Sequence, residues 1–268
     1  MPTLLIVSPH PDDESIGCGG LLHGLSGLGG TAGICWVTAG DGFRRDARDI
    51  YDTWRPTPAD FLSLGRTRMA EASNAAAILG VPPDRRYFLG FPDGHLEAVM
   101  RAYDGPPVSS PTTGVAAVPY RRCLQPGAPY TGTALVAAIA AVIDAQRPDV
   151  LVVPTGADHN ADHRAVAAAA GMAAIRTDWS GLWLSYLVHH DLYPGIGDRP
   201  RRVLNPSHVD LPGQRWNYRL STADEKAKLA AVRAHRTQWA AGLGVWLEAF
   251  VARNEPFGVL KGDTRCLS

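Results

Sequence analysis

Residues 3–14 have the sequence TLLIVSPHPDDE, an apolar run followed at once by a dense cluster of ionisable side chains. The run Thr3–Ser8 is short and rich in β-branched and large apolar residues, which predicts a buried β-strand. One imidazole and three carboxylates then lie within the five positions from His10 to Glu14. In an open α/β sheet, ligands bind at the carboxyl ends of the strands. A divalent metal ion at this end would relieve the repulsion among the carboxylates.

Apolar runs and helical periodicities alternate along the rest of the chain. Further strands are predicted at Thr31–Ala39, Arg85–Leu89, Asp149–Pro154 and Leu182–His190. Helices are predicted at Ile16–Leu28, Phe61–Leu79, Thr131–Gln146, Arg164–Ile175 and Ser221–Ala240, with a last short one within Gly242–Asn254. Ser15 is the expected N-cap of the first helix. This alternation predicts an α/β, Rossmann-like fold with a mostly parallel sheet, helices on both faces and the metal site at the strand carboxyl ends.

Three segments lack a clear period. Phe43–Pro58 is expected to be a polar loop, Val99–Tyr130 a long irregular insertion, and Tyr193–Gln214 a connection containing proline and glycine. So long an irregular segment inside a compact domain is usually functional or disordered. The residues after Asn254 show no clear pattern. Because no repeat or compositional boundary divides the chain, residues 1–268 are expected to form a single domain.

Composition argues against several classes of protein. The 268 residues carry 26 basic and 26 acidic side chains, giving zero formal net charge, and 46% are apolar. This balance argues against a nucleic-acid-binding or anionic-membrane surface, and against disorder. No GxGxxG or GxxxxGK sequence follows the first strand, so no phosphate cradle is expected. The short N-terminal apolar run and the lack of a membrane-spanning stretch predict a cytoplasmic protein, and a monomer and a homo-oligomer both fit.

The spacing of His10, Asp13 and His163 is a common layout for a catalytic zinc site, with two ligands close together and one distant. Two imidazoles favour Zn²⁺ over Mg²⁺, although iron and cobalt fit the same ligands. Three protein ligands leave the fourth position for water, whose pKa falls from about 15.7 toward about 7. The alternative is an acidic helix start favoured by the helix dipole, which explains the carboxylates but neither histidine. Scattered cysteines without a CxxC pair argue against a thiolate site or a disulfide framework. They are Cys18, Cys35, Cys123 and Cys266.

The motif His10-Pro11-Asp12-Asp13-Glu14 resembles the HPDDE motif of the LmbE-like (PIG-L) family of zinc-dependent N-deacetylases. Asp162-His163-Arg164 resembles the end of that family's HPDHR motif. Further likenesses lie at Thr38–Gly42, Arg68–Val81, Leu89–Gly94 and Lys226–Gln238. The resemblance implies that His10, Asp13 and His163 bind Zn²⁺, and that Asp12 is the general base that later returns its proton to the leaving amine. A base within hydrogen-bond reach contributes roughly 10²–10⁴-fold.

One position departs from the family pattern. Many members carry a histidine three residues before the last metal ligand, where it stabilises the oxyanion, and Asn160 stands there in this chain. The resemblance therefore implies a catalytic role for Asn160 as a hydrogen-bond donor, although an amide cannot protonate a leaving group. The histidines that could supply the missing imidazole are His159, His189 and His235, and each is also explained as a structural or surface residue.

The resemblance also implies substrate contacts for Asp41, Arg68 and Asp93. An alternative for Arg68 is a pair with Glu71, three residues along the same predicted helix. The resulting expectation is a zinc-dependent hydrolase that removes an N-acetyl or other N-acyl group from a small molecule or glycoconjugate containing an amino sugar. Two alternatives stay open. One is an amidase acting on a cysteine conjugate or an acylated antibiotic intermediate, and the other is a non-catalytic glycan-binding module.

Overall fold

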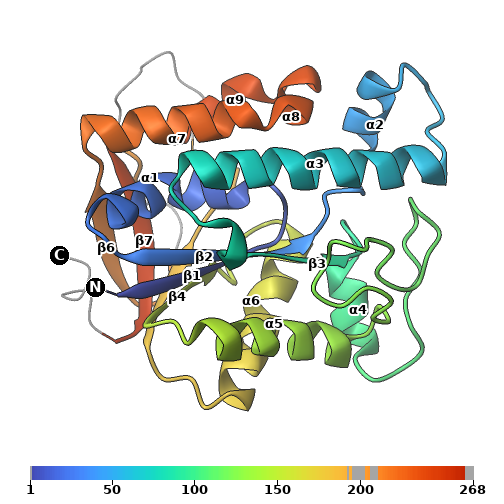
Figure 1. Cartoon of the computed structure of the whole chain (residues 1–268), viewed down its shortest axis with the longest axis horizontal. Coiled ribbons are helices and arrows are strands. Elements are labelled where there is room, and N and C mark those ends of the chain that lie inside the picture. Colours follow the sequence, from blue (N-terminus) through green and yellow to red (C-terminus); the bar gives the residue numbers. More distant parts are fainter. Residues whose placement is uncertain (1, 192, 195–202, 206–210, 263–268) are drawn as a thin grey trace.

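The computed structural model describes residues 2–191, 193–194, 203–205 and 211–262 (Figure 1). Cys266 and most of the predicted connection Tyr193–Gln214 therefore lie outside the described residues. The described part of the chain forms a seven-stranded sheet in the order β3-β2-β1-β4-β5-β7-β6. The strands are β1 (Thr3–Ser8), β2 (Thr31–Thr38), β3 (Arg86–Phe91), β4 (Val150–Pro154), β5 (Leu182–Tyr186), β6 (Gln214–Arg219) and β7 (Asn254–Lys261).

The first five strands run parallel, as the alternating pattern predicts. Strand β1 lies between β2 and β4, and its residues Leu4 to Val7 are fully buried. Both faces of a parallel sheet are covered, which explains why this strand is a continuous apolar run instead of an alternating one. Because β1 and β4 are parallel neighbours, with Ile6 opposite Val152, the loops that follow them meet at one edge of the sheet.

Helices cover both faces of the sheet. Their bounds are α1 (Asp13–Gly27), α2 (Arg44–Ile50), α3 (Pro58–Ile78), α4 (Leu96–Ala102), α5 (Gly132–Gln146), α6 (Ala161–Arg176), α7 (Thr222–Ala234), α8 (Arg236–Ala240) and α9 (Gly244–Glu248). Helices α1, α3 and α7 pack together on one face, and α4, α5 and α6 on the other (Figure 1). The predicted Rossmann-like architecture is confirmed. Among the described residues, no helix combines the length and apolarity that crossing a membrane requires.

Several predicted boundaries are wrong for local reasons. Ser15 is not an N-cap, because α1 begins at Asp13 and the Ser15 hydroxyl instead donates to Glu14 Oε1 at 2.8 Å. The predicted loop Phe43–Pro58 contains α2, a helix too short to show a reliable period. The predicted helix Ser221–Ala240 is divided at the buried His235, where α7 ends and α8 begins.

The insertion is irregular and largely ordered by its own contacts. It begins later than predicted, because α4 includes Val99 and extends to Ala102. Beyond α4 the chain contains only an isolated bridge between Ala117 and Pro129 before α5. Tyr120 and Tyr130 are nonetheless buried, so this segment packs against the core beside β3.

The antiparallel edge of the sheet was not predicted. Strand β7 pairs with β5 and β6, and it carries Pro256 and Gly258, which weaken a strand signal in the sequence. A buried ion pair ties this edge to the helices: Lys228 Nζ of α7 lies 2.6 Å from Glu255 Oε1 of β7. The same carboxylate accepts hydrogen bonds from the backbone N–H groups of Gly20 and Leu21 in α1. Side chains far apart in the chain therefore determine how this edge is assembled.

Candidate metal centre and active site

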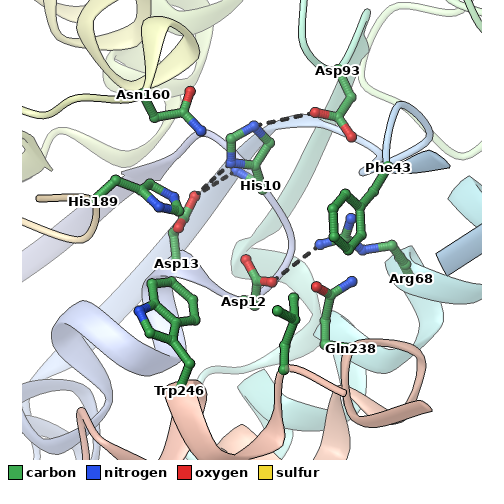
Figure 2. A pocket seen from close by; sticks show the side chains of 11 residues that line it. His10, Asp12, Asp13, Phe43, Arg68, Asp93, Asn160, His189, Gln238 and Trp246 are labelled. Carbon is green, nitrogen blue, oxygen red and sulfur yellow. Dashed lines mark hydrogen bonds and ion pairs between the residues drawn. The ribbon is translucent and has the colours of Figure 1, made fainter. Parts of the chain in front are cut away.

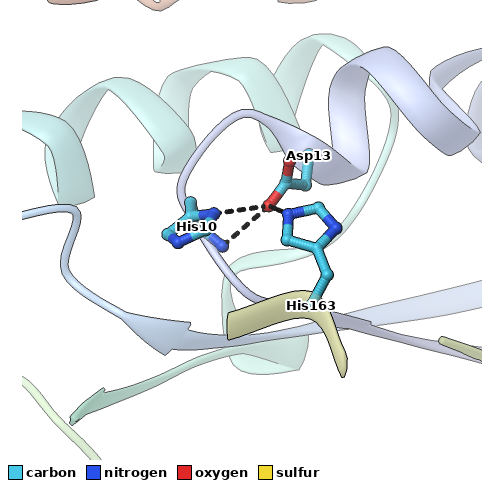
Figure 3. Close-up of side chains that lie close together, drawn as sticks. All are labelled: His10, Asp13 and His163. Atoms are coloured by element: carbon cyan, nitrogen blue, oxygen red, sulfur yellow. Dashed lines mark hydrogen bonds and ion pairs between the residues drawn. The ribbon is translucent and has the colours of Figure 1, made fainter. Parts of the chain in front are cut away.

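The three predicted metal ligands converge where the loops after β1 and β4 meet (Figure 3). Asp13 Oδ2 lies 3.0 Å from His10 Nδ1 and 3.1 Å from His163 Nε2. One ligand atom from each of the three residues lies within 4.8 Å of the others. His163 is completely buried and comes from the first turn of α6, whereas His10 precedes α1 and Asp13 begins it.

These distances fit a metal ion. Zinc binds imidazole nitrogen and carboxylate oxygen at about 2.0–2.2 Å, so tetrahedral ligand atoms lie about 3.4 Å apart. In addition, both ring nitrogens of the buried His163 lack a well-aligned hydrogen bond among the described residues. Buried polar atoms are almost always paired, and a cation held between Nε2 and the Asp13 carboxylate would satisfy this nitrogen. His10, Asp13 and His163 therefore form a candidate metal site, and their donor set suits zinc.

Further carboxylates lie beside the ring nitrogens of His10 and His163 that face away from Asp13. His10 Nε2 lies 3.2 Å from Asp93 Oδ1 and 3.3 Å from Asp162 Oδ2, and His163 Nδ1 lies 3.1 Å from Asp158 Oδ2. Such partners fix the orientation of a ligating imidazole and raise its basicity. Burial raises the pKa of Asp158, but His163 and backbone N–H groups outweigh burial and leave it below its ordinary value. No role was predicted for Asp158 or for Asp162, although Asp162 belongs to the DHR motif, because an aspartate carries no distinctive signal by itself.

Asp12 and Asp13 point to different sides of the loop because Asp12 has a strained backbone, with φ +147° and ψ −32°. A non-glycine residue in such a conformation costs on the order of 1–3 kcal/mol, and such residues cluster at active sites. Asp12 Oδ2 accepts a hydrogen bond of 3.1 Å from Arg68 Nη2, which comes from α3. Burial raises the pKa of Asp12 to about 7, against the attraction of the guanidinium. The adjacent carboxylates are thus separated, one toward the metal ligands and one free to titrate.

Arg68 does not pair with Glu71, so that alternative is wrong. Its guanidinium also donates to the backbone carbonyls of Gly40 and Pro11, while Glu71 accepts from the backbone and hydroxyl of Thr237. Arg68 thereby joins the loops after β1 and β2 to α3.

A cavity of about 160 Å³ opens beside these side chains (Figure 2). It is lined by His10, Asp12, Asp13, Phe43, Arg68, Asp93, Asn160, His189, Gln238, Leu243 and Trp246. Six of the eight predicted site residues are in this set. The buried His163 lies behind the lining, and Asp41 does not line the cavity. Its Oδ2 instead accepts a 2.5 Å hydrogen bond from the hydroxyl of Tyr120, and burial raises the pKa of Asp41 to about 7. The wall formed by Phe43, Gln238, Leu243 and Trp246 was not predicted.

Asn160 caps α6, which determines the direction of its side chain. Its Oδ1 accepts a 2.8 Å hydrogen bond from the backbone N–H of Asp162, so the amide nitrogen is the atom left over. Figure 2 shows this nitrogen on the side of His10, at the cavity. Among the described residues, no hydrogen bond to it is formed by protein atoms. The position is consistent with the predicted donor role.

The three histidines considered for the missing imidazole lie in different surroundings. His235 is buried behind the site, 3.1 Å from Ser15 Oγ and 3.4 Å from Glu14 Oε1. His159 is half exposed and pairs with Asp191. Only His189 among these three lines the metal cavity.

Comparisons with known proteins agree with this geometry. The sequence model of PIG-L, described as GlcNAc-PI de-N-acetylase, matches residues 5–175. The chain is 30% identical over 254 residues to a 1D-myo-inositol 2-acetamido-2-deoxy-alpha-D-glucopyranoside deacetylase from Mycobacterium sp. (strain KMS), covering 89% of this chain and 74% of that protein.

Two solved structures show how widely the fold is used. One is an N,N'-diacetylchitobiose deacetylase from Pyrococcus horikoshii, with 18% identity, a TM-score of 0.56, and 96% of this chain and 83% of that chain covered. The other is a 4-carboxy-2-hydroxymuconate hydratase from Pseudomonas putida KT2440, with 15% identity, a TM-score of 0.55, and 97% and 95% covered. At these identities the likeness shows the fold alone, and a fold does not determine the reaction. The family match over residues 5–175, together with the converging HPDDE and DHR residues, shows that this chain belongs to the PIG-L (LmbE-like) family of de-N-acetylases.

Proposed function

We propose that this chain is a zinc-dependent hydrolase that removes the N-acetyl group from an amino sugar in a small molecule or glycoconjugate. One observation carries the proposal: the three ligand atoms of a His/Asp metal site converge beside a separate, titratable carboxylate at a cavity. Hydrolysis of an amide needs both an activated water molecule and a group that moves its proton.

The proposed reaction divides the work between neighbouring side chains. When held by His10, Asp13 and His163, zinc supplies the Lewis acidity that activates water and polarises the amide carbonyl at neutral pH. Asp12 accepts a proton as the water oxygen adds to the carbonyl carbon. It then delivers the proton to the nitrogen as the C–N bond breaks, giving acetate and the free amine. Burial raises the pKa of Asp12 above its ordinary value, which strengthens this carboxylate as a base.

Arg68 and Asp93 are proposed both to position other site residues and to contact the substrate. Arg68 holds Asp12, and its side chain lines the cavity, where the guanidinium can meet a substrate oxygen. Asp93 holds His10 and accepts from the backbone of Gly42, and its carboxylate edge also lines the cavity. For Asp41 we propose a supporting role through Tyr120, without direct contact with the substrate.

The substrate class rests on the relatives and on the cavity wall. The mycobacterial relative is named for an acetamido sugar linked to inositol, and the archaeal structure for an acetylated disaccharide. Phe43 and Trp246 offer apolar ring faces, while Arg68, Asp93 and Gln238 offer hydrogen-bonding groups. Apolar faces combined with a few polar groups suit a pyranose ring.

The test is release of amine by the zinc-loaded protein from a panel of N-acetylated compounds. The panel contains N-acetylglucosamine, its inositol conjugate, N,N'-diacetylchitobiose, an acetylated cysteine conjugate and an N-acylated glycopeptide antibiotic. We expect cleavage of a sugar amide and about one zinc per chain. Preference for either of the last two substrates would favour the amidase alternative. Zinc binding with no turnover of any compound would favour a binding module and refute the hydrolase.

Two variants examine the division of roles. Asp13→Ala should lose zinc, whereas Asp12→Asn should keep zinc and lose at least about 10²-fold in kcat. Asp144→Asn, on the exposed surface of α5 away from the cavity, is the matched control and should match the parent protein. Full activity of Asp12→Asn would exclude Asp12 as the base.

A further inference from the structure

His189 lies at the metal cavity but has no role in the scheme above. It follows β5, and its ring lines the cavity together with Asn160 and Trp246 (Figure 2). Its ring centroid lies 4.8 Å from that of His163, in an edge-to-face arrangement. Among the described residues, no side chain or backbone group forms a hydrogen bond with this imidazole. An imidazole that is free to bond and faces a reaction cavity is suited to contact the substrate.

One ring contact and one backbone contact, besides the edge of His163, hold His189 in place. The indole of Trp246 stacks on it, with ring centroids 5.4 Å apart and an interplanar angle of 16°. The backbone N–H of His189 donates a 3.0 Å hydrogen bond to Asp158 Oδ2, the same oxygen that lies beside Nδ1 of His163. One buried carboxylate therefore sets the position of a metal ligand and of His189 together. Such preorganisation is what a group needs if it is to stabilise developing charge.

Asn160 lies near His189 at the same cavity. Its amide nitrogen and the ring of His189 border one cavity, next to Asp13 (Figure 2). A tetrahedral amide-hydrolysis intermediate carries its negative charge on the former carbonyl oxygen, and preorganised N–H donors lower the energy of that charge. His159 and His235 cannot replace His189 in this position, because neither lines the cavity.

We propose that His189 is a further catalytic residue, whose imidazole N–H donates a hydrogen bond, together with the amide of Asn160, to the carbonyl oxygen of the scissile amide. The inference rests on the proposed function. His189 keeps its proton throughout: the water oxygen bonds to the carbonyl carbon, the water proton passes to Asp12 and on to the amine nitrogen, and the C–N bond breaks. Trp246 acts as a positioning residue, because its stack on His189 determines where that N–H points.

The test measures turnover and binding for His189→Ala and His189→Gln, both loaded with zinc. Removal of one oxyanion donor typically costs about 10²–10³-fold in kcat, so His189→Ala should lose about 10²-fold with KM changed less than about threefold. His189→Gln retains an N–H donor and should recover at least about tenfold of that loss. Zinc content should stay at about one per chain in both variants. His159→Gln, outside the cavity, is the matched control and should match the parent protein.

A binding measurement separates this role from a structural one. A methylphosphonamidate analogue of the N-acetyl sugar has a tetrahedral centre with a charged oxygen, so its Kd should weaken for His189→Ala in proportion to kcat/KM. A kcat within twofold of the parent protein, an unchanged analogue Kd, or loss of zinc from His189→Gln would overturn the assignment. If the parent protein binds zinc but cleaves no amide, the proposed function fails and this assignment fails with it. If the parent cleaves amides while His189→Ala is fully active, only the assignment fails.

Discussion

The substitution Asp158→Asn should weaken metal binding, although Asp158 does not touch the metal position. Its Oδ1 accepts from the backbone N–H of Asn160 at 2.8 Å, and its Oδ2 accepts from those of Val188 and His189 at 3.1 and 3.0 Å. Oδ2 also lies 3.1 Å from Nδ1 of His163. Both carboxylate oxygens are therefore needed, and an amide offers only one acceptor oxygen.

The expected loss for Asp158→Asn is estimated for the amide orientation that keeps more of the hydrogen bonds. With the amide oxygen in the place of Oδ2, the NH₂ group faces the N–H of Asn160, and a buried donor left without a partner costs about 1–3 kcal/mol. The charged partner of His163 is also replaced by a neutral one. Loss of such a partner typically reduces metal affinity 10–100-fold, or about 1.4–2.7 kcal/mol. We expect the zinc Kd to rise by this factor and the metal-free protein to lose about 1–3 kcal/mol of unfolding free energy.

Competition with a chromophoric chelator gives the zinc Kd, and urea unfolding of the metal-free protein gives the stability. Asp144→Asn, an exposed surface change, is the control for both measurements. A zinc Kd for Asp158→Asn within threefold of the parent value would refute the reasoning. It would show that Nδ1 of His163 does not depend on this carboxylate.

Three further outcomes are expected. Lys228→Met should lower the unfolding free energy by about 3–5 kcal/mol in urea, because Glu255 would stay buried without its cation; a loss under 1 kcal/mol would contradict this. For Asp41→Asn, the expected change in the pH dependence of stability follows from the pKa of Asp41, which is about 7 in the folded protein and 3.8 ordinarily. The protonated carboxyl favours the fold below about pH 4, and this contribution, on the order of 4 kcal/mol, is lost as pH rises to about 7. The unfolding free energy of the parent protein, measured from pH 5 to 8, should fall relative to that of Asp41→Asn as pH rises to about 7. Equal pH dependence in the two proteins would exclude this contribution. Chelation of zinc should abolish amine release, and added zinc should restore it; activity that survives exhaustive chelation would rule out a metal-dependent reaction.

Much of the architecture could be predicted from the sequence because its signals are local. The run Thr3–Ser8 is apolar throughout, and it forms the central buried strand β1. The alternation with helical periods predicted a mostly parallel sheet, and the first five strands do run parallel. Since parallel strands end at one edge, the positions of His10, Asp13 and His163 just after β1 and β4 favoured their convergence, which the pairing of β1 with β4 completes.

Other features depend on contacts between residues far apart in the chain, so no local pattern could show them. Strand β7 owes its place to Lys228 and to pairing with β5, and Arg68 binds Asp12 instead of its helical neighbour Glu71. The histidine that faces the metal cavity was one of three with equal standing in the sequence. Stacking on Trp246, more than 50 residues later in the chain, distinguishes His189 from the others. Which residues are candidate metal ligands follows from their side-chain type and their place after the strands. The direction in which each of these side chains points is determined by tertiary packing.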